Sequence, residues 1–477
     1  MSKEIVRQLD TIFRARSIAV IGASKSPGKW GYRMVYTPLT TGYRGPIYPV
    51  NPNETEVCGL PAYANVRDIP GEVDMAVIVV PAAIAPQAMA DCAAKGIKGV
   101  VMITAGFAEV GKEGQVLQDE VVRIAQAAGI RFVGPNGMGI YTSAVSLSLC
   151  FDVAPRKGKI AFVSQSGTFG GLLAQIAITK GYGLSKFISI GNQADLKAAD
   201  YLEYLAEDPD TSAIVFYMEG FKDGKRFFNI AREVIRRKPI VIYKAGKTEA
   251  AARATMSHTS SIAGSDAVFE AMCKQVGIIR ANETIQIFDM AEALVNQPLP
   301  AGNRVGIIGS GGQGVVISDT CEQLGLKVPA LDMETRLELK KGLPAHAPIP
   351  TNPVDFAGGN RTAEDEAKAA DALAQIPYID GIICNAPNLR GGERTTGEAA
   401  RSAIAGAEML AAIPKKYGKP VVTLRWRGGG GGDVVQSIVR AAGIPAYDTP
   451  EQCARAMFAL AEYARVKRMY EGNGTKS

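Results

Sequence analysis

Near its N-terminus the chain reads Ser17-Ile-Ala-Val-Ile21 and then Gly22-Ala-Ser-Lys-Ser-Pro-Gly-Lys29. The apolar run predicts a buried β-strand, and the residues after it predict a turn that opens a helix. Backbone N–H groups and the helix dipole favour an anion at such a turn, and the lysines add positive charge. The spacing is not G-x-G-x-x-G, so the standard dinucleotide fingerprint is absent.

Further apolar runs follow at 75–80, 99–103 and 131–133, with helix-like segments between them. Unbroken apolar runs are typical of parallel strands that are covered on both faces, and ligands of such sheets bind at the carboxyl ends of the strands. The glycines at 106 and 134–139 fall at those ends. We therefore expect a doubly wound α/β domain with its ligand site along this edge.

The second predicted strand, Gly45 to Val50, ends in Asn51-Pro52-Asn53. An NAD domain usually has Asp or Glu there to hold the ribose hydroxyls, so these residues argue against an NAD(P)-dependent oxidoreductase. Nearby Lys25, Lys29 and Arg44 suit a ligand with additional phosphate, although solvated charges at the rim of a sheet would have the same pattern.

The strand, turn and helix pattern starts again after each of two linker-like segments, 151–159 and 297–303. A length of 477 residues is enough for about three domains. We predict three consecutive α/β domains at 1–150, 151–298 and 299–477. The Gly428 to Gly432 run is interpreted as a loop without function.

Composition excludes several classes of protein. A net charge of +6 without a long Lys/Arg run does not indicate nucleic-acid binding. No apolar run approaches a membrane span, and the N-terminus lacks a signal-peptide core. The seven cysteines are widely spaced, without a CxxC pair, which predicts reduced thiols in a cytoplasmic protein and no zinc site.

Three polar features could carry chemistry. Ser166-Gly167-Thr168 opens a predicted helix and could hold phosphate, although Ser-Gly is also an ordinary helix cap. Glu219 follows a strand, where it could orient an imidazole or merely cap the helix near Asp223. His258, one of two histidines, lies in a polar loop, where a lone histidine is usually a surface or packing residue. The other, His346, has no such setting.

Seven short motifs occur in order along nearly the whole chain. They are Val20-Ile-Gly-Ala-Ser24, Tyr48-Pro-Val-Asn-Pro52, Gly134-Pro-Asn136, Ser164-Gln-Ser-Gly167, Gly191-Asn192 with Ala194-Asp195, Ser257-His-Thr259 with Ala263-Gly-Ser-Asp266, and Asn352-Pro-Val-Asp355. Together they resemble the motifs of one family, the α subunits of nucleoside-diphosphate-forming acyl-CoA synthetases, which are relatives of succinyl-CoA synthetase α.

The resemblance implies a CoA-binding Rossmann-like domain followed by two flavodoxin-like domains. It implies the reversible reaction of an acid, CoA and ATP to acyl-CoA, ADP and phosphate, through an acyl phosphate and a phosphohistidine at His258. Glu219 would orient that histidine. The residues implied to bind phosphate are Ser166, Gly167, Thr168 and Asn136, and those implied to bind CoA are Gly22, Ala23, Ser24, Ser26, Lys29, Val80 and Pro81.

The same resemblance implies a partner. The chain has no apparent room for an ATP-grasp domain, so we expect a separate β subunit that carries ATP and Mg²⁺, in an α2β2 assembly, and we assign no metal ligand to this chain. The substrate would be a small carboxylic acid whose identity the sequence leaves open.

Two positions depart from the family pattern. Ser260 stands where glycine is common, and Gly137 stands where cysteine is common, which bears on the thioester end of the CoA site. The alternative to an enzyme is a non-catalytic regulator that keeps the fold and binds CoA or nucleotide. Such a protein would tolerate the loss of His258, Glu219 or Ser166, and all three are present.

Overall fold

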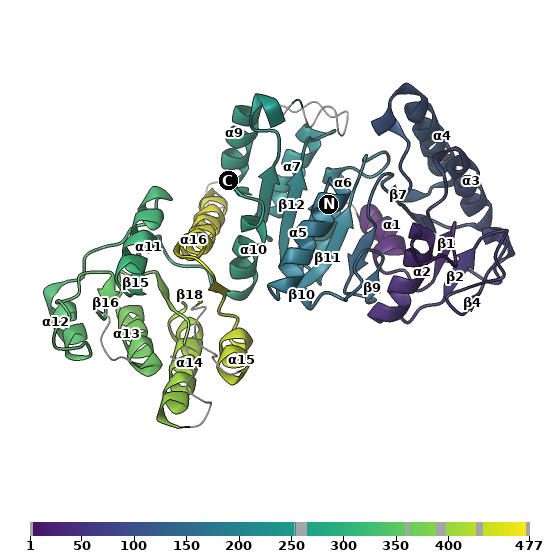
Figure 1. Ribbon diagram of the computed structural model, residues 1–477. Helices are drawn as coiled ribbons and strands as arrows, with labels where there is room; N and C mark the ends of the chain where they lie inside the picture. The colour runs from purple at the N-terminus through teal and green to yellow at the C-terminus, as the bar shows by residue number, and fades with distance from the viewer. Residues whose placement is uncertain are drawn as a thin grey trace. The chain divides into compact units, whose positions relative to one another are not determined.

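The computed structural model describes residues 3–251, 253, 265–357, 362–387, 397–425 and 433–473. The chain forms two compact units, residues 1–287 and 288–477. Three mainly parallel sheets with helices packed against them make this an α/β fold, as predicted (Figure 1). The three predicted domain ranges stay predictions.

The first sheet of unit 1 has the strand order β2-β1-β5-β6-β7, and all of its strands are parallel. Helices α3 and α4 lie against each other and bury one face of this sheet (Figure 1). The elements are α1 (Lys3–Phe13), β1 (Ile18–Ile21), α2 (Trp30–Thr41), β2 (Ile47–Val50), the β3 (Glu56–Val57) and β4 (Leu60–Pro61) hairpin, β5 (Met75–Ile78), α3 (Ala85–Lys95), β6 (Gly99–Met102), α4 (Lys112–Ala128) and β7 (Arg131–Val133), with short 3₁₀ turns η1 (Val66–Asp68), η2 (Ala82–Ile84) and η3 (Ala108–Val110).

The second sheet of unit 1 has the order β14-β13-β12-β10-β11-β8-β9. Its last two strands are antiparallel and come from residues before the predicted linker. The elements are β8 (Ile140–Thr142), β9 (Leu147–Ser148), β10 (Lys157–Ser164), α5 (Gly167–Thr179), β11 (Leu184–Ser189), α6 (Ala198–Glu207), β12 (Ala213–Met218), α7 (Gly224–Val234), β13 (Ile240–Lys244), α9 (Asp266–Val276) and β14 (Ile279–Arg280).

Unit 2 contains a parallel sheet of order β16-β15-β17-β18-β19. Val354–Asp355, at the end of the seventh quoted motif, pairs with β15 as an edge strand. The elements, starting with the helix that spans the boundary, are α10 (Gln286–Asn296), β15 (Val305–Gly309), α11 (Gly312–Gln323), α12 (Met333–Lys341), β16 (Val354–Asp355), α13 (Ala363–Gln375), β17 (Gly381–Asn385), α14 (Glu398–Tyr417), β18 (Val421–Leu424), α15 (Asp433–Ala441), β19 (Ala446–Tyr447) and α16 (Pro450–Asn473).

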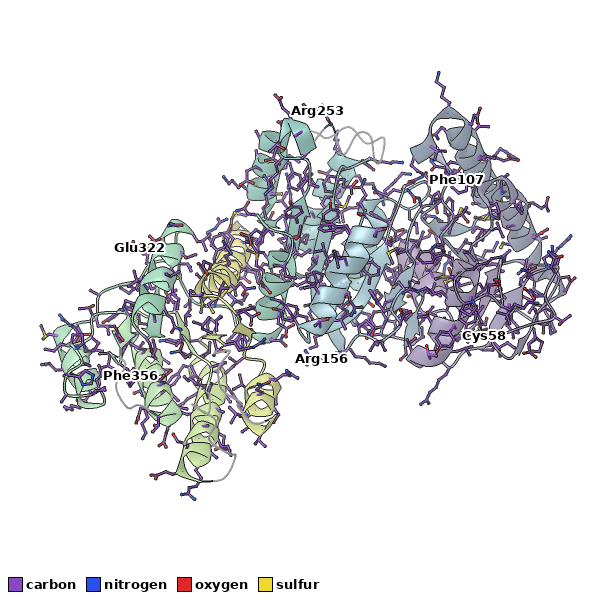
Figure 2. All side chains as sticks on the ribbon, in the orientation of Figure 1. Cys58, Phe107, Arg156, Arg253, Glu322 and Phe356 are labelled. Atoms are coloured by element: carbon purple, nitrogen blue, oxygen red, sulfur yellow. The ribbon has the colours of Figure 1, made fainter. Side chains whose placement is uncertain are left out.

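The seven cysteines are free, and all except Cys58 are buried, which confirms that most of them pack in the core (Figure 2 labels Cys58). Among the helices of the described ranges, none is long and apolar enough to cross a membrane.

Candidate functional site

A pocket of about 560 Å³ lies in unit 1, where the carboxyl ends of strands from both sheets meet. Its apolar wall contains Trp30, Val80, Pro81 and Met138, and its polar wall contains side chains that follow β7, β10 and β11. The lining residues are Trp30, Val79, Val80, Pro81, Ile103, Thr104, Ala105, Asn136, Gly137, Met138, Gln165, Ser166, Gly167, Thr168, Gly191 and Asn192. This is the edge at which parallel sheets bind their ligands.

Helix α5 opens into the pocket. Ser166 occupies the N-cap position with an extended backbone, but its side chain makes no capping hydrogen bond. The first N–H groups of a helix have no partner inside the helix, so those of Gly167 and Thr168 are available to a ligand. The Ser164 hydroxyl fixes this turn by donating to the Ser166 carbonyl at 2.7 Å. The helix start therefore suits an anion.

Glu219 follows β12 and is 5 % exposed. The Oε1 atom of Gln165 accepts hydrogen bonds from the backbone N–H of Glu219 at 3.0 Å and of Gly220 at 3.1 Å. Burial and the neighbouring Glu219 carboxylate raise the pKa of Tyr217. Asp223 caps α7 by accepting from the N–H of Arg226, so the alternative in which Glu219 caps that helix is wrong.

Two asparagines that line the pocket, Asn192 and Asn136, belong to one chain of hydrogen bonds. The Nδ2 atom of Asn192 donates to Oε2 of Glu109 at 2.5 Å and to Oε1 of Gln118 at 3.1 Å. Its Oδ1 atom must therefore face Asn136, whose Nδ2 donates to it at 3.3 Å. The Glu109 carboxylate thus sets the orientation of both asparagines.

Glu109 also holds the loop after β6. Its Oε1 atom accepts from the N–H of Gly106 at 2.6 Å and of Phe107 at 3.2 Å, and the side chain of Phe107, which Figure 2 labels, is fully buried. Burial alone would raise the pKa of Glu109, but the hydrogen bonds from Asn192 and from these backbone groups outweigh it and lower the pKa. The carboxylate is therefore ionised at neutral pH.

In the turn after β1, the first backbone N–H groups are bonded within the protein, whereas the sequence predicted that they face an anion. The N–H groups of Gly22 and Ala23 both bond to the Val50 carbonyl, and so they do not point at a ligand. Asn51 donates to the Ala23 carbonyl at 2.6 Å, which gives this residue a structural role at the end of β2. Ser24 accepts from the N–H of Ser26.

The lysines of the same turn also differ from one another. Lys25 pairs with Glu54 at 3.2 Å, whereas Lys29 precedes α2 and has no carboxylate partner among the described residues. Trp30, the next residue, is 43 % exposed and lines the pocket. The last residue of the turn is therefore followed directly in the chain by a residue that lines the pocket.

The structure brings six of the predicted site residues together in the pocket: Val80, Pro81, Asn136, Ser166, Gly167 and Thr168. Glu219 reaches it through Gln165, while Gly22, Ala23, Ser24, Ser26 and Lys29 lie in the adjoining turn. His258 lies outside the described residues. In the described part of the chain, no group of three or more His, Cys, Asp or Glu side chains could hold a metal ion.

Sequence reasoning missed Trp30, Gln165, Met138 and Asn192 as pocket residues. Gln165 and Asn192 stand inside quoted motifs, so their positions at strand ends were the available signal. Gly137 also lines the pocket, and a Cβ atom there would lie 2.8 Å from the Ser189 carbonyl oxygen. Any side chain at this position requires the end of β11 to move.

Comparison with known proteins gives the same picture. Residues 16–143 match the model of a CoA binding domain, and residues 157–294 match a succinyl-CoA ligase like flavodoxin domain. The chain is 43 % identical to the ADP-forming acetate–CoA ligase II subunit alpha of Pyrococcus furiosus, over 96 % of this chain and 98 % of that one. It is 37 % identical to the ADP-forming acetate–CoA ligase I of Archaeoglobus fulgidus, of which it covers 64 %.

A solved structure agrees over the full length. The acetyl-coenzyme A synthetase 1 of Ca. Korarchaeum cryptofilum, in complex with phosphate and ADP, matches with a TM-score of 0.84 at 34 % identity, over 98 % of both chains. The chain therefore belongs to the family of ADP-forming acetate–CoA ligase alpha subunits, which are acid–thiol ligases, and it has a CoA-binding domain followed by a succinyl-CoA ligase-like domain.

Proposed function

We propose that this chain transfers a phosphoryl group through His258 between an acyl phosphate and a nucleotide. The observation that carries the proposal is the pocket itself, where the uncapped start of α5 faces the strand ends of the sheet in the CoA-binding range. In the direction of ATP synthesis, phosphate attacks the acyl carbon of acyl-CoA and the CoA thiolate leaves, which gives the acyl phosphate. The imidazole of His258 then attacks the phosphorus atom and the acid leaves as its carboxylate. The phosphohistidine finally passes its phosphoryl group to ADP, which frees the imidazole.

Each predicted residue has a part in this proposal. The first N–H groups of α5, at Gly167 and Thr168, stabilise the charge on the transferred group. Glu219 accepts from the second ring nitrogen of His258 and so fixes the tautomer. Val80 and Pro81 flank the pantetheine arm, and the turn from Gly22 to Lys29 binds the phosphates of CoA.

The proposal includes a partner. The α-subunit name of the Pyrococcus relative and the additional length of the Archaeoglobus relative both support an ATP-grasp β subunit that holds ATP or ADP with Mg²⁺. We propose an α2β2 assembly that works in the cytoplasm. The free thiols support a reducing compartment. Acetate is the first carboxylic acid to test.

Labelling tests the assignment of His258. With acyl-CoA and labelled phosphate, the wild-type complex should acquire an acid-labile, base-stable phosphoryl group, and His258→Ala should not. His346→Ala is the matched control, because its ring contacts only the Ala357 carbonyl at 3.3 Å in the described part of the chain. Undiminished labelling of His258→Ala would refute the proposal.

The role of Glu219 is tested separately. Glu219→Gln retains the size of the side chain but removes the charge that stabilises the imidazolium, so we expect slower labelling without loss of folding. Thermal melting checks the fold, and rapid-quench labelling measures the rate. A rate equal to that of the wild type would show that the carboxylate has no part in the transfer.

A further inference from the structure

Gln165 is the one polar side chain of the pocket that is also bonded to the backbone around Glu219. It lies between β10 and α5 and is 4 % exposed. Its backbone N–H donates to the Tyr217 carbonyl at 3.0 Å, which fixes the start of the side chain against β12. The residue therefore joins the turn before α5 to the strand end that carries Glu219.

The orientation of the Gln165 amide is determined by its partners. Two backbone N–H groups, those of Glu219 and Gly220, point at one end of the amide, and that end must be the acceptor Oε1. The Nε2 atom is consequently the other end. None of the described residues accepts a hydrogen bond from it, although the side chain is buried and lines the pocket.

An amide N–H₂ that opens onto a pocket, without an acceptor among the described residues, is completed there by water or by a ligand. Its position suggests which ligand, because Ser166, Gly167 and Thr168 line the same pocket and directly follow it in the chain. The N–H groups of α5 and the Nε2 atom of Gln165 are all donors. A tetrahedral oxyanion such as phosphate supplies the several acceptors that they need.

We propose that Nε2 of Gln165 donates a hydrogen bond to the phosphate bound at the start of α5, while Oε1 of the same amide holds the backbone of Glu219. Gln165 then contacts the reacting group and positions the carboxylate that orients His258. The identity of the anion rests on the proposed function. The donor geometry does not.

Gln165→Glu separates the two ends of the amide. The substituted carboxylate can still accept from the N–H groups of Glu219 and Gly220, but it repels phosphate where Nε2 would donate. Gln165→Met removes both ends. Gln175→Glu is the matched control, because it adds the same charge at an exposed position of α5.

Direct binding of inorganic phosphate to the full-length chain, measured by ³¹P NMR titration, is the first test. Loss of one hydrogen bond to a charged ligand should raise the dissociation constant about ten- to hundredfold in both Gln165 variants. The Gln175→Glu variant should bind like the wild type. Unchanged binding in Gln165→Glu would overturn the proposal, as would an absence of phosphate binding to the wild type.

The pH dependence separates a donor role from a purely structural one. Protonation restores an O–H donor to the substituted carboxyl, so phosphate binding by Gln165→Glu should approach that of the wild type as the pH is lowered. If Gln165 only supported the fold, the ratio of the two dissociation constants would not change with pH. Thermal melting of both variants shows whether the fold is retained.

Labelling of the holoenzyme distinguishes this inference from the proposed function. If the wild type binds phosphate but is not phosphorylated at His258, the proposed function fails while the anion site stands. If the wild type is phosphorylated and Gln165→Glu is phosphorylated with the same phosphate KM, the role of Gln165 is refuted and the proposed function stands.

Discussion

Replacing Glu109 with glutamine should disturb the pocket from a distance, because this carboxylate sets the orientation of two amides. The substituted side chain can still accept from the N–H groups of Gly106 and Phe107 through Oε1. Its other end becomes an N–H₂ group that meets the Nδ2 atom of Asn192, donor against donor. Asn192 must then turn over or lose this bond, and Asn136 must follow.

The magnitude follows from the bonds that change. Hydrogen bonds to a charged group contribute about 1.5–3 kcal/mol and neutral ones about 0.5–1.5 kcal/mol. Weakening the two backbone bonds and losing that of Asn192 should therefore destabilise unit 1 by about 2 kcal/mol. With an unfolding entropy of about 2.1 cal/mol/K per residue over residues 1–287, the melting temperature should fall by about 3 °C.

Two measurements check this prediction. Differential scanning calorimetry should show the lower melting temperature, and steady-state kinetics should show a higher KM for phosphate, because Asn136 lines the pocket. Glu113→Gln is the matched control, since Glu113 is an exposed carboxylate in the first turn of α4. A Glu109→Gln enzyme with wild-type melting and wild-type kinetics would refute the orienting role.

Three further perturbations have clear expected outcomes. Because hydrogen bonds lower the pKa of Glu109, its carboxylate contributes to the free energy of unfolding above the ordinary pKa of 4.5, and this contribution is lost as the pH falls towards the lowered pKa. Acid denaturation should show this loss in the wild type but not in Glu109→Gln. Lys186→Met removes one partner of the buried Asp208 carboxylate, at 2.5 Å, while Arg14 at 3.2 Å and Thr211 at 2.5 Å remain bonded to it, so chemical denaturation should show a cost of about 1.5–3 kcal/mol. Asp208→Leu leaves the buried Lys186 ammonium without its carboxylate and should cost more, about 3–5 kcal/mol. Gly170→Ala places a Cβ atom 2.1 Å from the Ser164 hydroxyl that holds the turn before α5, so phosphate KM should rise, and an unchanged KM would contradict the importance of that turn.

Sequence patterns were sufficient for the long elements because unbroken apolar runs leave few alternatives to a covered parallel strand. The prediction for 99–103 matches β6, and that for 131–133 matches β7. Two-residue strands such as β9 and β16 were missed, because so short a segment has no periodicity and is defined only by its neighbour.

In the candidate site, too, some features follow from the local sequence and others depend on residues far away in the chain. The start of α5 follows from local sequence, since a Ser-Gly turn before a helix has a known geometry. The orientation of Gln165 depends on Glu219 and Gly220, more than fifty residues away, and that of Asn136 depends on Glu109. Contacts of this kind are set by the sheet order, which no single strand specifies.

The strands β8 and β9 have a consequence for dissecting the protein. The chain leaves the first sheet before these strands; β8 pairs with β11 in the second sheet, β9 pairs with β8, and the Thr142 hydroxyl donates to the Phe13 carbonyl. A cut at residue 150 would therefore leave β11 as an uncovered edge on one fragment and an orphan hairpin on the other, and both are templates for aggregation. The residues that line the pocket before and after position 150 therefore have to stay in one polypeptide, both in truncated variants and in chimaeras with relatives.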